Sequence, residues 1–161
     1  MANLKKETYL KTLFLLSVSI LIAAYSIQYL LGHQPCNLCI IERIPYALAI
    51  IILLFNYKFK KDQVFYTILL LLVFAFSFLI SVYHFGIEQE FINESSICVT
   101  NNADLITKDD ILKSLGKVTV NCKNVAFKIF GLSLTTYNLI ISILMFLIST
   151  KIYLLSNDIK K

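Results

Sequence analysis

The chain has 161 residues, of which 58% are hydrophobic and 16% are charged, and its formal net charge is +5. Soluble domains are typically about 45–50% apolar and about 25% charged, so these proportions argue against an ordinary soluble domain. The apolar residues are gathered in blocks rather than spread evenly, and this pattern indicates membrane spans. The length allows a single integral membrane domain over residues 1–161.

Four blocks are long enough to cross a bilayer, which takes roughly 20 mostly apolar residues in a helix. We expect spans at about 12–31, 41–57, 64–83 and 132–151. The second is the weakest because Glu42 and Arg43 lie in its first turn, which must then sit at the interface. The first is too long for a signal peptide and lacks a small-residue cleavage site, so it should remain as an anchor. The predicted fold is an all-α, four-transmembrane-helix bundle.

Lysine clusters predict the orientation of these spans. They precede the first span, separate the second from the third, and follow the fourth: Lys5, Lys6, Lys11, Lys58, Lys60, Lys61, Lys151, Lys160 and Lys161. Because Lys and Arg favour the cytoplasmic side, both termini should be cytoplasmic. Two loops, at about 32–40 and 84–131, should then face outward. Orientation explains the basic charge, so we expect no nucleic-acid partner.

All four cysteines lie in or beside these outward loops: Cys36 and Cys39 in the first, Cys98 and Cys122 in the second. Extracytoplasmic space is oxidising, so disulfides can form there. Four cysteines allow three pairings. A zinc site made of both pairs is an alternative, although Cys98 and Cys122 lack the tight spacing of a zinc knuckle. A purely structural disulfide in the long loop is another alternative.

Cys36-Asn37-Leu38-Cys39 is a CxxC motif at the outer end of the second span. We expect Cys39 near the helix N-terminus, where backbone N–H groups and the CxxC spacing favour a thiolate. Arg43 follows one turn later on the same face, so it could supply a permanent cation and face an electron acceptor. Taken alone, Arg43 could be an interface anchor, and Glu42 could be a helix-surface neighbour with no chemical role.

The second loop is long for a connection without structure of its own. Thr107 and Asp110 resemble a helix start, and the apolar residues that follow predict a short helix on the membrane surface. His84 follows the third span, close to the outer interface. A lone interfacial histidine is more often a structural partner than a catalyst.

Three segments resemble the DsbB family, the quinone-dependent disulfide-forming membrane proteins. They are QPCNLCIIERIPY at residues 34–46, YHFGIE at 83–88 and FGLSLTTYN at 130–138. The first carries the family pattern C-x-L-C-x-x-x-R and is specific in this context, whereas the other two would be weak alone. The resemblance covers nearly the whole chain, including four spans and two outward loops.

The resemblance implies an electron path and a bacterial inner-membrane location. A reduced periplasmic thioredoxin-fold oxidase (DsbA-like) would attack a Cys98–Cys122 disulfide, at Cys98. Cys122 would exchange with Cys36, and the electrons would pass to a membrane quinone, either ubiquinone or menaquinone. Cys39 would be the thiolate beside the quinone. The resemblance also implies cofactor-binding roles for Arg43 and His84.

The sequence leaves two other functions open. A vitamin K epoxide reductase-like enzyme also combines a small helical bundle with CxxC and loop cysteines, but there the motif generally lies near the last spans. A non-enzymatic membrane subunit could use the same cysteines for structural disulfides or a bound metal.

Overall fold

The computed structural model describes residues 2–59, 63–93, 98, 122, 128–129 and 131–158. Its helices are α1 (Ala2–Tyr29), α2 (Asn37–Ile41), α3 (Arg43–Lys58), α4 (Gln63–Glu88) and α6 (Leu134–Asp158). A short antiparallel pair, β1 (Lys128–Ile129) and β2 (Leu132–Ser133), precedes α6 and was not predicted. The short surface helix predicted after Thr107 lies outside the described residues.

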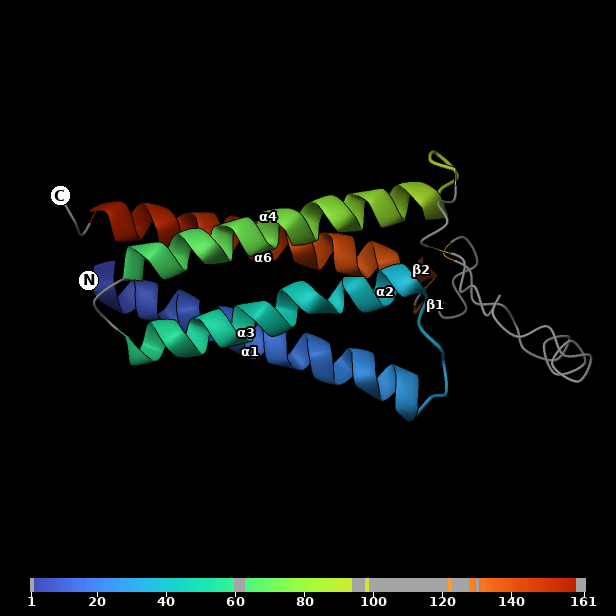
Figure 1. The fold of residues 1–161 in the computed structure, drawn as a ribbon, viewed down its shortest axis with the longest axis horizontal. Helices are drawn as coiled ribbons and strands as arrows, with labels where there is room; N and C mark the ends of the chain where they lie inside the picture. The colour runs from blue at the N-terminus through green and yellow to red at the C-terminus, as the bar shows by residue number, and fades with distance from the viewer. Residues whose placement is uncertain are drawn as a thin grey trace, which may run out of the picture.

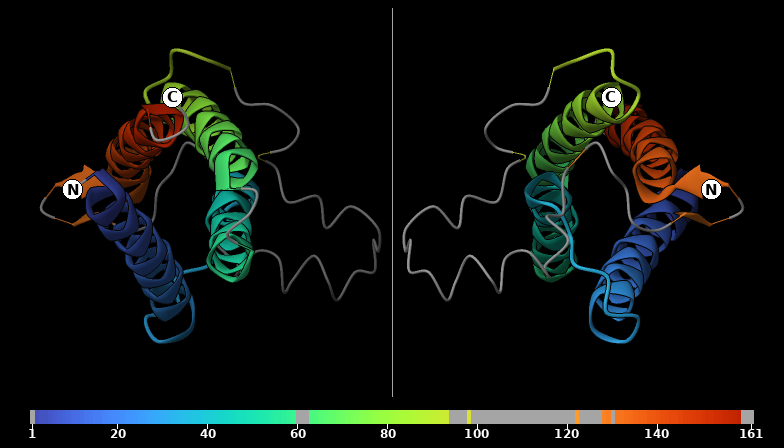
Figure 2. Two further views of the ribbon diagram at one scale, coloured as in Figure 1. Left: turned by 90° about the vertical axis from the view of Figure 1, so that its left-hand side faces the viewer. Right: turned by 90° about the vertical axis from the view of Figure 1, so that its right-hand side faces the viewer.

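The helices form a bundle in which each long helix packs against two neighbours, in the cyclic order α1, α3, α4, α6 (Figures 1 and 2). Both termini lie at one end of this bundle, and α2 with β1 and β2 lies at the other. Counting α2 and α3 as one span, four helices in the described part of the chain are long and apolar enough to cross a membrane. The prediction of an all-α, four-span fold is confirmed.

A stripe of buried residues on each helix explains this packing. On α4 the buried positions recur every three or four residues: Thr67, Leu70, Phe74, Ser77, Ser81 and His84. The α3 stripe contains Tyr46, Ala49, Leu53 and Asn56. Such spacing places side chains on one helix face. The opposite faces carry exposed large apolar side chains, such as Leu72, Leu79 and Leu147, which suit contact with lipid.

Buried hydroxyl groups join α3, α4 and α6 within the bundle. The Ser142 Oγ atom lies 3.3 Å from the hydroxyls of Tyr46 and Ser77 and 3.1 Å from that of Ser81. Asn138 accepts a hydrogen bond from the Tyr46 hydroxyl at 2.7 Å and donates one to Ser81 at 2.8 Å. Hydrogen bonds between helices contribute to association inside a bilayer, where water cannot replace them.

Replacing Ser142 with alanine should therefore destabilise the bundle by about 0.6–1.7 kcal/mol, the range for interhelical hydrogen bonds in membranes. Reversible denaturant unfolding in micelles measures this change. Ser19→Ala is the matched control because Ser19 is exposed on α1. An equal loss in both variants would contradict a specific role for the Ser142 contacts.

The spans differ from their predicted ends in one way that matters for the site. Helix α4 continues to Glu88, whereas the sequence placed its end at 83 and assigned His84 to the following loop. His84 is therefore held by a regular helix. It occupies the next position of the buried α4 stripe, and it faces the bundle interior rather than the outer solvent.

Candidate functional site

The CxxC motif lies at the start of α2, at the end of the bundle away from the termini (Figure 1). Cys36 is the N-cap residue of this helix, and its Sγ accepts a hydrogen bond from the backbone N–H of Cys39 at 3.2 Å. The two Sγ atoms lie 2.6 Å apart. The sequence led us to expect this helix-start stabilisation at Cys39, but the structure places the donated N–H at the Cys36 sulfur.

His84 and Glu42 extend a buried chain of polar groups from Cys36. His84 Nε2 lies 3.6 Å from Cys36 Sγ, and His84 Nδ1 lies 3.2 Å from Glu42 Oε2. All three residues are at most 6% exposed. The Cys39 side-chain hydrogen bond and the neighbouring His84 lower the pKa of the Cys36 thiol to about 5, against the opposing effect of burial. Both contacts therefore favour the thiolate form of Cys36 when the pair is reduced.

Pro45 explains why α2 ends and α3 begins at Glu42. Proline lacks a backbone N–H, and its ring would clash with the carbonyl of Ile41 in a continuous helix. The chain accordingly ends α2 and restarts as α3, with Glu42 as the shared capping residue. Glu42 is 6% exposed. The interpretation of Glu42 as a helix-surface neighbour was therefore wrong.

The two cysteine pairs meet in one buried cluster. Cys98 and Cys122 form the disulfide that the family resemblance implied. Both are almost completely buried, and they pack with Cys36, Leu38 and Ile87, while Cys39 borders the same cluster. Residues separated by more than 50 positions in the sequence are thus brought together at one end of the bundle. The four cysteines therefore lie together at this end of the bundle.

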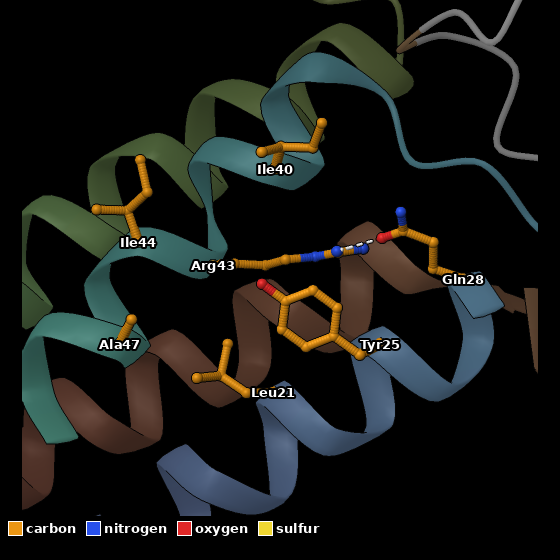
Figure 3. Close-up of a pocket in the computed structure, with 7 residues that line it drawn as sticks. All are labelled: Leu21, Tyr25, Gln28, Ile40, Arg43, Ile44 and Ala47. Atoms are coloured by element: carbon orange, nitrogen blue, oxygen red, sulfur yellow. Dashed lines mark hydrogen bonds between the residues drawn. The ribbon is translucent and has the colours of Figure 1, made fainter.

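Arg43 lies on a different side of the motif from His84. Its Nη1 donates a hydrogen bond to Gln28 Oε1 at 2.5 Å, and its guanidinium carbon lies 4.9 Å from the centre of the Tyr25 ring (Figure 3). Among the described residues, Arg43 therefore hydrogen-bonds to Gln28 of α1 and not to Cys39. The sequence did not predict roles for Tyr25 or Gln28, because nothing local links them to the motif.

A cavity of about 300 Å³ lies between α1 and the α2–α3 segment, beside Arg43 (Figure 3). Its lining residues are Leu21, Tyr25, Gln28, Ile40, Arg43, Ile44 and Ala47. The lining is mostly apolar, with one cation and one amide, a combination typical of small-molecule sites. Ile40 directly follows Cys39 in α2, so the cavity adjoins the CxxC motif.

The site also contains three potential metal ligands. The ligand atoms of Cys36, Cys39 and His84 lie within 4.8 Å of one another, and thiolate and imidazole suit zinc. The four-cysteine zinc site considered from the sequence is not formed, because Cys98 and Cys122 are joined to each other. A metal at the remaining three ligands would occupy the sulfur atoms needed for thiol exchange, so the two uses exclude each other.

Together these features define a class of protein: a four-helix membrane protein with two cysteine pairs gathered at one end of its bundle. The chain belongs to the disulfide bond formation protein DsbB family, which matches residues 6–152. This makes it a disulfide-forming membrane protein and a thiol oxidoreductase by family. Membership also decides against the vitamin K epoxide reductase-like reading.

A relative from Rickettsia prowazekii (strain Madrid E), uncharacterized protein RP370, is similar to this chain. The two are 32% identical over 146 residues, which cover 87% of this chain and 85% of the relative. No solved structure matches the chain.

Proposed function

We propose that the protein reoxidises a thioredoxin-fold disulfide donor (DsbA-like) and passes the electrons through its two cysteine pairs to a membrane quinone. The observation that carries this proposal is the shared cluster of Cys36, Cys39, Cys98 and Cys122. Structural disulfides need no second pair beside them, whereas thiol–disulfide exchange requires one sulfur to reach another.

The proposed path begins at the Cys98–Cys122 disulfide. A thiolate of the reduced partner attacks Cys98, which releases the Cys122 thiolate. Cys122 then attacks Cys36 in the oxidised CxxC pair, which releases Cys39 as a thiolate beside the cavity. Each step breaks one S–S bond, forms another and leaves the electron pair on the departing sulfur.

The cavity beside Arg43 fits a quinone ring in both size and lining. Its apolar side chains suit a lipid-soluble ring, and the Arg43 guanidinium suits a carbonyl oxygen that gains negative charge. A bound quinone supplies an acceptor for two electrons and two protons. In this proposal Arg43 and Gln28 orient the ring, whereas His84 lies on the Cys36 side of the pair.

Replacing Arg43 with methionine should raise the quinone KM roughly 10- to 100-fold, the loss expected for a hydrogen bond from a charged donor. Steady-state reduction of a short-chain quinone measures this KM. Arg43→Lys, which keeps the charge but not the planar fork, should lie between methionine and wild type. Lys58→Met, a cation lost from the other end of α3, is the control and should leave KM unchanged.

The proposed location is the bacterial inner membrane, with both termini cytoplasmic and the cysteine pairs on the periplasmic side. The lysine distribution supports this orientation, as does the position of both termini at the bundle end opposite the cysteines. Labelling a cysteine placed at the N-terminus from each side of sealed membranes tests it.

Activity of the purified protein in lipid nanodiscs tests the whole proposal. A reduced thioredoxin-fold oxidase should lose its thiols only when quinone is present, with one quinone reduced for each disulfide formed. Protein that carries stoichiometric zinc and shows no quinone-dependent thiol loss would instead support the non-enzymatic alternative, in which Cys36, Cys39 and His84 hold a metal.

A further inference from the structure

A buried carboxylate beside the CxxC pair is not explained by electron transfer alone. The Glu42 side chain is 8% exposed, and its Oε1 has no hydrogen-bond partner among the described residues. An ionised carboxylate is costly to bury unless it is paired. Among the described residues, the one ion-pair contact of this carboxylate is with His84 Nδ1, at 3.2 Å from Oε2.

The histidine connects this carboxylate to one particular sulfur. A carboxylate 3.2 Å from Nδ1 favours a proton on that nitrogen, while Nε2 faces Cys36 Sγ at 3.6 Å. When Nε2 is also protonated, the imidazolium can donate to a Cys36 thiolate. A nucleophilic sulfur, a histidine and an orienting third group in this order form the arrangement that activates thiols in enzymes.

We propose that Glu42, acting through His84, is a positioning residue that keeps Cys36 in the thiolate form whenever it leaves a disulfide. The existence of this thiolate does not depend on the proposed electron path. Its use in turnover rests on the proposed function.

In turnover the relevant step is the release of Cys36 from Cys122. The Cys98 thiolate attacks Cys122, the Cys98–Cys122 bond forms, and the Cys122–Cys36 bond breaks. The electron pair stays on Cys36 Sγ, where His84 stabilises the charge without transferring its proton. A stabilised thiolate is the better leaving group in such an exchange, so Glu42 should speed regeneration of the loop disulfide.

Other groups near Cys36 must be considered because they also affect its charge. Cys39 faces it from α2, and Glu42 faces His84 from the α2–α3 junction. Tyr83 of α4 borders the same cluster. The Cys98–Cys122 disulfide does not titrate. Among these groups, His84 is the one able to carry a positive charge next to the Cys36 sulfur.

A titration of Cys36 tests this proposal without quinone or partner protein. In the triple variant Cys39→Ser, Cys98→Ala, Cys122→Ala, Cys36 is the one remaining thiol, and the serine that replaces Cys39 retains a hydrogen-bond donor. Ultraviolet absorbance of the thiolate is followed against pH in nanodiscs, with Cys36→Ala subtracted. Adding Glu42→Gln should raise the midpoint by about 1–3 pH units, because His84 without its carboxylate partner loses the positive charge that faces the thiolate, and this is the range for losing a neighbouring opposite charge.

Glu88→Gln is the matched control. Like Glu42, Glu88 lies at the cysteine end of the bundle, where it ends α4. Its carboxylate, however, accepts a hydrogen bond from Ser133 at 2.8 Å. It should leave the midpoint unchanged. His84→Asn should raise the midpoint at least as much as Glu42→Gln. This variant can replace Glu42→Gln in the titration if Glu42→Gln does not fold. An unshifted midpoint in both variants, or an equal shift in Glu88→Gln, would overturn the proposal. If the midpoint shifts as expected in Glu42→Gln, but the wild-type protein shows no quinone-dependent oxidation of a partner, the thiolate proposal is supported and the proposed electron path is contradicted.

Discussion

Replacing Cys39 with serine is expected to lower quinone-dependent oxidation of the partner by roughly 10³-fold or more, as expected when a reacting nucleophile is removed. Cys39 borders the buried cluster, its sulfur lies 2.6 Å from that of Cys36, and its neighbour Ile40 lines the cavity beside Arg43. Without this sulfur, Cys36 cannot form the disulfide that accepts two electrons from the loop pair, so no reduced pair forms to pass them to the quinone. The exchange reactions at Cys98 and Cys122 should still occur once.

The rate of quinone reduction, followed by its absorbance, measures this loss. Asn37→Ser is the matched control because it alters the same short helix but keeps both sulfurs. A Cys39→Ser protein that turns over as fast as the control would contradict the assignment of Cys39 as the sulfur next to the acceptor.

Replacing Cys122 with serine is expected to abolish turnover with the protein partner while leaving the CxxC pair reducible by a small dithiol. The disulfide between Cys98 and Cys122 is the proposed entry point, and only Cys122 can carry the electrons onward to Cys36. A loss of roughly 10³-fold is again expected for a missing nucleophile. Cys98, left as a free thiol, should form a lasting mixed disulfide with the oxidised partner.

Cys98→Ser provides the comparison. It should lose the same turnover, but it should form no mixed disulfide with the partner, because in the proposed path the partner bonds to Cys98 and not to Cys122. Non-reducing gels of the two variants after mixing with oxidised partner distinguish them. Equal mixed-disulfide yields from both variants would show that the attack is not directed to Cys98.

Much of the fold follows from the sequence because a bilayer imposes simple rules. Uncharged blocks of sufficient length must become spans, so four of them predict a four-helix bundle. The residues at which the spans end were harder to predict. The α4 helix continues to Glu88 because His84 and Gly86 face buried neighbours rather than water, and no hydropathy pattern distinguishes those two situations.

The positions of Glu42 and His84 could have been found from spacing. Glu42 continues the α3 stripe of Tyr46 and Ala49, and His84 continues the α4 stripe of Ser77 and Ser81. A charged residue on a buried stripe is costly unless it has a partner, so two such residues at the same end of adjacent helices indicate a pair.

The Arg43 environment could not have been predicted in the same way. Its contacts with Tyr25 and Gln28 depend on how α1 packs against α3, which sequence spacing within one helix does not reveal. The expected pairing of Arg43 with Cys39 relied on local helical geometry alone. Tertiary packing instead turned the guanidinium toward α1 and created the cavity.

Mapping the disulfides during a single reaction tests the central claim, that electrons pass from the Cys98/Cys122 pair to the Cys36/Cys39 pair. Quinone-free oxidised protein is mixed with reduced partner, quenched by acid and alkylation, and digested for mass spectrometry. The account predicts a peptide pair joined by Cys36–Cys122, with Cys39 alkylated. If Cys36–Cys39 stays intact while Cys98–Cys122 is reduced, the two pairs do not communicate and the account is contradicted.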